Sequence, residues 1–146
     1  MDKSIENFIQ NKRVAVVGVS RNNKKFGSLA YQELKQRGYQ VSAVNPAMTE
    51  ASGDPCYPNL LALQGKVDGV VVCVPSTQGE QVLREAAQAS IKNVWLQAGS
   101  ESAGLVNLGH ELNLNLITGK CILMYATPVT GFHGWHRGFV KFFGKL

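Results

Sequence analysis

A glycine turn between an apolar strand and a helix constrains the fold of this chain more than any other feature. Residues 14–17 read Val-Ala-Val-Val and stop at Gly18, and a helical pattern leads from there to Gly38. A second apolar run follows at residues 41–44. This order is typical of a βαβ unit, in which free N–H groups and the helix dipole at the turn point toward a bound phosphate. We therefore expect a nucleotide-binding turn at residues 18–27.

The residue that ends the second strand does not suit NAD. An NAD site usually has an acidic residue there, which accepts a hydrogen bond from the ribose 2′-hydroxyl. This chain has Asn45 followed by Pro46, and a neutral amide can hydrogen-bond a nucleotide without repelling a nearby phosphate. The turn also departs from G-x-G-x-x-G, because Ser20 stands at the second glycine position and Gly27 lies nine residues after Gly18.

The long turn carries three cations, Arg21, Lys24 and Lys25, in a chain of net charge +5. Cations in such a loop can contact a diphosphate and reach a further phosphate, and Ser20 and Ser28 offer hydroxyl donors. The alternative interpretation is a structural strand-to-helix turn with solvated lysines.

Size and composition indicate one globular domain over residues 1–146, with a core at about 10–126 and an aromatic, basic tail at 127–146. No apolar run reaches the ~18 residues that span a membrane, so stable membrane insertion is not expected. No long basic run of the nucleic-acid-binding type occurs either. The three cysteines form no CxxC pair, which favours reduced thiols and a cytoplasmic location.

Strand and helix patterns continue to alternate after the first unit. We expect strands at 70–74, 93–97 and 114–117, helices at 76–89 and 100–112, a short helix at 4–11, and a loop at 46–60. The pattern predicts a Rossmann-like three-layer α/β fold with a mostly parallel five-stranded sheet and helices on both faces. Right-handed crossovers would bring the turns after the strands to one carboxyl edge, where a ligand should bind.

Three further segments fall on this edge. Val74-Pro75-Ser76 opens a second helix, which Ser76 or Thr77 can cap. Gln97, which ends a strand before the turn at Gly99, needs a partner or a ligand if it is buried. Trp95 is interpreted as a core residue. Cys121 follows a turn and could approach the ligand, although a buried, unreactive cysteine is the default.

The sequence contains no catalytic set. No serine or cysteine lies at a triad-like spacing from His110, His133 or His136, so no catalytic residue is predicted. His133 and His136 lack a third ligand, and no metal site is expected. The tail carries aromatic residues between Phe132 and Phe143, which are expected to pack over the sheet edge or against a partner subunit in a homodimer.

Seven ordered motifs resemble the small, stand-alone CoA-binding proteins, the YccU-like family related to the CoA-binding domain of succinyl-CoA synthetase α-subunits. The resemblance covers about residues 10–126. Its motifs are Val14–Ser20, Lys25-Phe26-Gly27, Gly38-Tyr39, Val44-Asn45-Pro46, Val74-Pro75, Val94–Gly99 and Cys121–Met124.

The resemblance implies binding of coenzyme A or an acyl-CoA. It places the diphosphate on residues 18–27 and the adenine near Val74-Pro75-Ser76, with lining from Asn45-Pro46 and residues 97–99. It does not imply catalysis, because the synthetase's phosphorylated histidine lies in a further domain.

The predicted cofactor-binding residues come from the glycine turn and from the ends of the later strands. They are Gly18, Val19, Ser20, Arg21, Lys24, Lys25, Phe26, Gly27, Asn45, Pro46, Val74, Pro75, Ser76, Gln97, Gly99 and Cys121. Two alternative functions stay open: an NAD(H)-binding redox-sensing domain, and a thiol-reactive protein that forms a mixed disulfide with CoA at Cys121.

Overall fold

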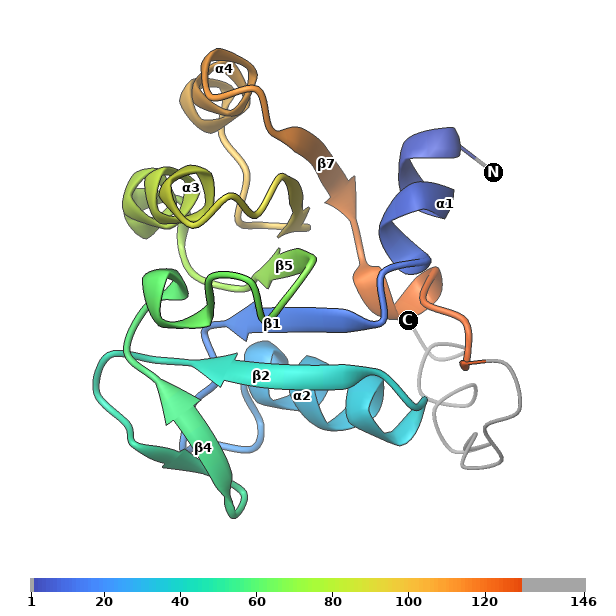
Figure 1. The fold of residues 1–146 in the computed structure, drawn as a ribbon, viewed down its shortest axis with the longest axis vertical. Helices are drawn as coiled ribbons and strands as arrows, with labels where there is room; N and C mark the ends of the chain where they lie inside the picture. The colour runs from blue at the N-terminus through green and yellow to red at the C-terminus, as the bar shows by residue number, and fades with distance from the viewer. Residues whose placement is uncertain (1, 130–146) are drawn as a thin grey trace.

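The computed structural model describes residues 2–129 of the chain (Figure 1). The aromatic part of the predicted tail, with His133 and His136, lies outside the described residues. No helix in the described part is long and apolar enough to cross a membrane.

A seven-stranded sheet forms the centre of the fold, in the order β3-β4-β2-β1-β5-β6-β7. All neighbouring strands are parallel except β3 and β4, so the predicted Rossmann-like class is confirmed. The strands are β1 (Arg13–Val17), β2 (Gln40–Val44), β3 (Glu50–Ala51), β4 (Asp54–Tyr57), β5 (Gly69–Val72), β6 (Asn93–Gln97) and β7 (Asn115–Lys120).

The prediction of five strands was wrong because β3 and β4 lie in residues 46–60, which were expected to be a loop. Both strands are short, and Pro55 pairs with Glu50 inside the hairpin. β4 lies between β3 and β2, but Pro55 stands near its start, before the Cys56–Tyr57 stretch that pairs with β2. Proline is tolerated at such a position, so it does not exclude a strand. The hairpin is held by tertiary contacts, because the Tyr31 hydroxyl donates to Asp54 at 2.7 Å and Lys35 pairs with the same carboxylate.

Helices cover both faces of the sheet (Figure 1). Alternate residues of β1 divide between the faces: Val14 and Val16 join one core, and Ala15 and Val17 join the other. The first core takes in α1 (Lys3–Ile9), α2 (Phe26–Gln36) and the 3₁₀ helix η3 (Ile122–Met124). The second takes in the 3₁₀ helix η1 (Leu60–Leu63), α3 (Gly79–Gln88) and α4 (Ala103–Glu111).

The helix expected at 76–89 begins differently from the prediction. Residues Ser76–Gln78 form a separate 3₁₀ turn, η2, and α3 starts only at Gly79. Neither helix has a side-chain cap, so the expected cap from Ser76 or Thr77 was wrong. The turn closes instead through the backbone, where the Gln78 N–H donates to the Pro75 carbonyl at 2.9 Å.

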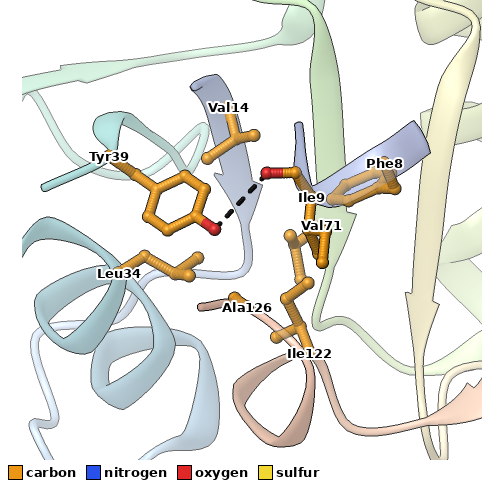
Figure 2. Close-up of a pocket in the computed structure, with 8 residues that line it drawn as sticks. All are labelled: Phe8, Ile9, Val14, Leu34, Tyr39, Val71, Ile122 and Ala126. Atoms are coloured by element: carbon orange, nitrogen blue, oxygen red, sulfur yellow. Dashed lines mark hydrogen bonds between the residues drawn. The ribbon is translucent and has the colours of Figure 1, made fainter. Parts of the chain in front are cut away.

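The first core is closed beneath α1. Phe8 and Ile9 of α1 meet Leu34 of α2 and Ile122 of η3 around a cavity of about 10 Å³ (Figure 2). The Tyr39 hydroxyl at its rim donates to the Thr127 carbonyl at 2.8 Å and more weakly to that of Ile9 at 3.4 Å. A cavity of this size holds about one water molecule at most. This cavity therefore offers no room for a cofactor.

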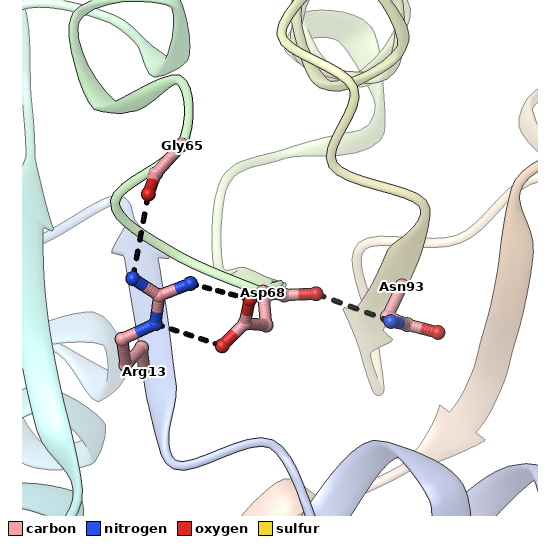
Figure 3. Close-up of polar contacts among 4 residues, drawn as sticks. All are labelled: Arg13, Gly65, Asp68 and Asn93. Atoms are coloured by element: carbon pink, nitrogen blue, oxygen red, sulfur yellow. Dashed lines mark hydrogen bonds and ion pairs between the residues drawn. The ribbon is translucent and has the colours of Figure 1, made fainter.

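Polar side chains link the strands at the amino edge of the sheet. Arg13 at the start of β1 donates two hydrogen bonds to the Asp68 carboxylate, at 2.9 and 2.7 Å (Figure 3). The Asn93 side chain donates to the Asp68 carbonyl, and Asn115 donates to the Asn93 side chain. The guanidinium also lowers the pKa of the Asp68 carboxyl. These bonds join the starts of β1, β5, β6 and β7. The turns that follow the strands lie at the opposite, carboxyl edge of the sheet.

Arg37, just after α2, joins that helix to the segment after β7. Its side chain is 1% exposed and donates to the carbonyls of Leu123 and Ala126, at 3.0 and 2.6 Å. It also pairs with Glu33 at 3.3 Å. Burial lowers the pKa of Arg37, and the charge of Glu33 acts in the opposite direction. The pair holds η3 against the C-terminal end of α2.

We expect Arg37→Leu to lower the free energy of unfolding by about 3 kcal/mol or more, because it leaves Glu33 and two carbonyls without their buried partner. Arg84→Leu is the matched control, since Arg84 pairs with Glu80 at the same helical spacing but on the surface. That variant should lose no more than about 0.5 kcal/mol. Urea unfolding followed by circular dichroism measures both, and equal losses would contradict the role given to Arg37.

Candidate functional site

A cleft runs along the carboxyl edge of the sheet, where the chain leaves β1, β2, β5 and β6. It has two chambers, which share Gly18, Val74 and Gln78. The β2-side chamber, of about 630 Å³, is lined by Val17, Gly18, Val44, Asn45, Pro46, Pro58, Asn59, Val74, Thr77, Gln78, Gln81, Val82 and Glu85. The β6-side chamber, of about 640 Å³, is lined by Gly18, Ser20, Lys25, Phe26, Gly27, Cys73, Val74, Pro75, Gln78 and Gln97–Ser100.

The cleft brings together most of the predicted binding residues. Those that line it are Gly18, Ser20, Lys25, Phe26, Gly27, Asn45, Pro46, Val74, Pro75, Gln97 and Gly99. They come from four separate strand ends, as the right-handed crossovers predict. Their role in binding a cofactor remains a prediction.

Five predicted residues do not line either chamber. Val19 is buried in the first core. Arg21 and Lys24 are exposed on the turn, and Ser76 lies in η2. Cys121 is partly buried against the first core. Because Arg21 and Lys24 stand outside the chambers, Lys25 is the loop cation that contributes to the lining.

The hydroxyl of Ser28, expected as a ligand donor, is used within the turn. It donates to the Ser20 carbonyl at 2.8 Å and accepts from the Ser20 N–H at 3.0 Å. The Ser20 hydroxyl accepts from the Asn22 N–H at 3.1 Å, and Asn22 in turn accepts from the Lys24 N–H. The turn is thus shaped by its own short polar side chains.

Two glycines fix how α2 meets the turn. A Cβ on Gly27 would lie 2.2 Å from the Gly18 carbonyl oxygen, which is far inside van der Waals contact. A Cβ on Gly18 would lie 2.7 Å from the carbonyl oxygen of Cys73, and Gly18 has a φ of +108°. The first turn of α2 therefore rests directly on the backbone that follows β1.

The two longer helices that begin at the cleft have no side-chain cap. The N-caps Lys25 of α2 and Gln78 of α3 make no capping hydrogen bond. By contrast, Asp2 caps α1 and Ser102 caps α4 through their side-chain oxygens. An uncapped helix start presents N–H donors and a partial positive charge. At α3 part of this capacity is used, because the Gly79 N–H donates to the Ser76 carbonyl of η2, so the start of α2 offers more of these donors. The cleft is therefore suited to an anionic group.

Asn45 holds the turn and β2 together. Its side-chain Nδ2 donates to the Val19 carbonyl at 2.7 Å, and its Oδ1 accepts from the Ala47 N–H at 2.8 Å. Its backbone N–H donates to Tyr57 of β4. The amide is thus occupied by the protein on both sides. An aspartate could not donate to Val19, which gives a structural reason for the absence of the NAD-type acid.

Gln97 and Trp95 are fixed by the segment after β7. Gln97 is buried, and its Oε1 accepts from the Ile122 N–H at 3.0 Å, so its expected partner is within the chain. Trp95 is fully buried, which confirms it as a core residue, and its Nε1 donates to the Lys120 carbonyl at 2.9 Å. Beside them, burial raises the pKa of the Cys73 thiol to about 12. That thiol is protonated at neutral pH and is a poor nucleophile.

The sequence reading missed the contribution of α3. Gln81 and Glu85 line the β2-side chamber from successive turns of α3, and Gln78, at the end of η2, precedes them. Their spacing of three and four residues was visible as a polar stripe beside the apolar Val82 and Ala86. Pro58 and Asn59 were also missed, because the β4 strand that leads to them was not predicted. Within residues 2–129, no group of histidine, cysteine and acidic residues could hold a metal ion.

A family model described as "CoA binding domain" matches residues 12–127. The chain belongs to this CoA-binding domain family. The match covers nearly the same residues as the resemblance seen in the sequence motifs, and it includes every strand that borders the cleft.

Members of the family occur both inside larger enzymes and alone. Acetate–CoA ligase [ADP-forming] II of Archaeoglobus fulgidus is 31% identical over 136 residues, which is 90% of this chain and 20% of the ligase. The chain spans 18% to 28% of the length of the four such ligases compared. The uncharacterized protein YneT of Bacillus subtilis is 27% identical over 113 residues, 77% of this chain and 84% of YneT.

Solved structures show the same fold in proteins of similar size. A conserved hypothetical protein from Pyrococcus furiosus is 34% identical with a TM-score of 0.73, over 76% of this chain and 96% of the other. A hypothetical protein from Pyrococcus horikoshii OT3 is 25% identical with a TM-score of 0.80, over 86% and 89% of the two chains.

Gly27→Ala should destabilise the protein by about 2 kcal/mol or more, because the added methyl group meets immovable backbone. Gly104→Ala is the matched control: Gly104 is also the second residue of its helix, but only the Ser102 side chain lies within 4 Å. It should be neutral or stabilising by up to about 1 kcal/mol. Thermal unfolding distinguishes the two, and a neutral Gly27→Ala would refute the close contact.

Asn45→Asp should cost about 1–3 kcal/mol at pH 7, because a carboxylate would face the Val19 carbonyl. The native fold would then raise the pKa of the new carboxyl, so the loss should shrink as the pH falls toward about 4. Asn59→Asp is the control, since Asn59 uses only its acceptor, on the Ala62 N–H. Urea titrations at both pH values test this, and a pH-independent loss would contradict it.

Proposed function

We propose that this protein binds coenzyme A or an acyl-CoA in the carboxyl-edge cleft, without catalysis of its own. The observation that carries the proposal is the uncapped start of α2, which opens on the β6-side chamber beside the glycine turn. Membership in the CoA-binding domain family supports the identity of the nucleotide. The ligases among the relatives are named for CoA as well.

The diphosphate is best accommodated at the junction of the two chambers. Gly18 lies there, with Gly27 and Lys25 at the start of α2 on one side and the start of α3 on the other. Each such contact contributes about 0.3–1 kcal/mol when exposed. Micromolar binding needs about 8 kcal/mol. Burial of the two ends of the ligand must therefore supply most of the affinity.

The two chambers then take the two ends of the ligand. In a Rossmann-like sheet the adenosine ribose lies at the end of the second strand, so we place the adenosine in the β2-side chamber. Val74 lines this chamber, whereas Pro75 and Ser76, which were also expected near the adenine, do not. Val44, Pro46, Pro58 and Val74 give that chamber apolar walls for the adenine. The pantetheine arm then extends into the β6-side chamber, past Pro75 toward the turn at Gly99.

A binding role without chemistry agrees with the groups that line the cleft. Among the described lining residues, the titratable side chains are Lys25, Cys73 and Glu85. Lys25 and Cys73 line one chamber and Glu85 the other, and the thiol is protonated at neutral pH. These groups form no acid–base pair around a common point. A homodimer and a cytoplasmic location remain predictions from the sequence.

Isothermal titration calorimetry with CoA, acetyl-CoA and NAD tests the proposal. We expect CoA to bind and NAD to bind more weakly. Lys25→Gln should weaken CoA two- to fivefold, the loss of about 0.3–1 kcal/mol, and the effect should shrink at high salt. Lys66→Gln, which removes the same charge from an exposed site outside both chambers, should leave the affinity unchanged.

Three results would refute the proposal. The first is that CoA at millimolar concentration gives no heat of binding and no competition with another ligand. The second is tighter binding of NAD than of CoA, which would favour the redox-sensor alternative. The third is a covalent CoA adduct at Cys121 as the only bound form, seen by intact-mass spectrometry.

A further inference from the structure

The charges that line the cleft are divided between its two chambers. Of the described residues around the β6-side chamber, Lys25 is the one that carries a charge, and it is positive. Around the β2-side chamber, again among the described residues, the single charged side chain is Glu85. Arg21 and Lys24, which the sequence suggested as contacts for a further phosphate, line neither chamber. The one charge that the described lining residues bring to the chamber at the end of β2 is thus negative.

Glu85 is held in a defined position. Its Oε1 accepts from the Leu60 N–H at 3.1 Å, and its Oε2 accepts from the Gln81 side chain at 3.0 Å. Gln81 lies one turn earlier on α3 and lines the same chamber. Each carboxylate oxygen can accept more than one hydrogen bond. The carboxylate is therefore oriented and retains acceptor capacity toward a ligand.

Glu85 lines the chamber in which a ribose-binding acid would be expected. A ribose-binding acid normally ends the second strand, and here that place is taken by Asn45, whose amide is occupied by Val19 and Ala47. Glu85 reaches the same chamber from α3. A carboxylate there accepts hydrogen bonds from ribose hydroxyls and repels a phosphate on the same ribose.

We propose that Glu85 is a specificity-determining residue that binds a ribose hydroxyl of the nucleotide and disfavours a phosphate on that ribose. The inference rests on the proposed function, since it takes a nucleotide of the CoA type to occupy the cleft. On this inference, the affinity for CoA comes from contacts with the diphosphate and from burial in the two chambers. The 3′-phosphate of CoA adds nothing to it. An adenine nucleotide of the CoA type whose ribose carries free hydroxyls, such as dephospho-CoA, should therefore bind at least as tightly as CoA itself.

Calorimetry with CoA and dephospho-CoA tests the inference through the ratio of the two dissociation constants. In the wild-type protein, dephospho-CoA should bind at least as tightly as CoA. Glu85→Gln keeps an acceptor for the Leu60 N–H and removes the charge, so it should shift the ratio toward CoA by about tenfold. Glu80→Gln is the matched control, because Glu80 lies on the same helix, pairs with Arg84 at the surface and does not line the chamber.

The outcomes separate this inference from the proposed function. If neither ligand binds, the proposed function fails and the inference fails with it. If CoA binds much more tightly than dephospho-CoA, and Glu85→Gln leaves the ratio within twofold of the wild-type value, CoA binding stands and the role of Glu85 is refuted. An equal shift in Glu80→Gln would also refute it, because the effect would then reflect overall charge.

Discussion

The contact between Gly27 and the Gly18 carbonyl determines how the rest of the site is built. It lets the first turn of α2 rest on the backbone after β1, with no side chain between them. The helix start, its free N–H groups and Lys25 are thereby fixed at the mouth of the cleft. The same helix reaches across one face of the sheet, and Arg37, just beyond its C-terminal end, holds the segment after β7. One helix thus connects the cleft with the core on that face.

Several polar side chains near the cleft serve the protein rather than a ligand. The amide of Asn45 joins the turn to β2, Gln97 holds the start of η3, and Ser28 closes the turn on Ser20. Buried polar groups need such partners, and the strand ends supply them locally. What is left for a ligand is backbone N–H groups, apolar walls, the polar side chains that η2 and α3 contribute, and one charge of each sign. This combination suits binding and orientation of a long, anionic molecule.

Much of the fold follows from the sequence, because β-branched runs alternate with helical patterns from Val14 to Ile117. The prediction failed where local signals are weak. The β3–β4 hairpin contains Pro55 and is held by Tyr31 and Lys35 from α2, which no local pattern encodes. The start of α3 was misjudged because Ser76 and Thr77 are good caps in isolation, whereas the chain after Pro75 forms a 3₁₀ turn.

The sequence was enough to predict which strand ends form the site. It was a poorer guide to which side chains line it. Crossover handedness places Gly18, Asn45, Val74 and Gln97 on one edge without any knowledge of contacts. Which side chains face the cleft depends on packing: Val19 turns into the core, and Glu85 enters from a helix that the motifs did not mark.

The double use of Asn45 also bears on how the cofactor preference of this fold could change during evolution. A single substitution to an acid would supply the acidic residue of an NAD-type site and at the same time remove the bond from residue 45 to Val19 that shapes the glycine turn. The path from one cofactor to the other therefore passes through a destabilised intermediate, unless a second change first supplies Val19 with another donor. Selection on stability alone would therefore keep Asn45 in such a lineage.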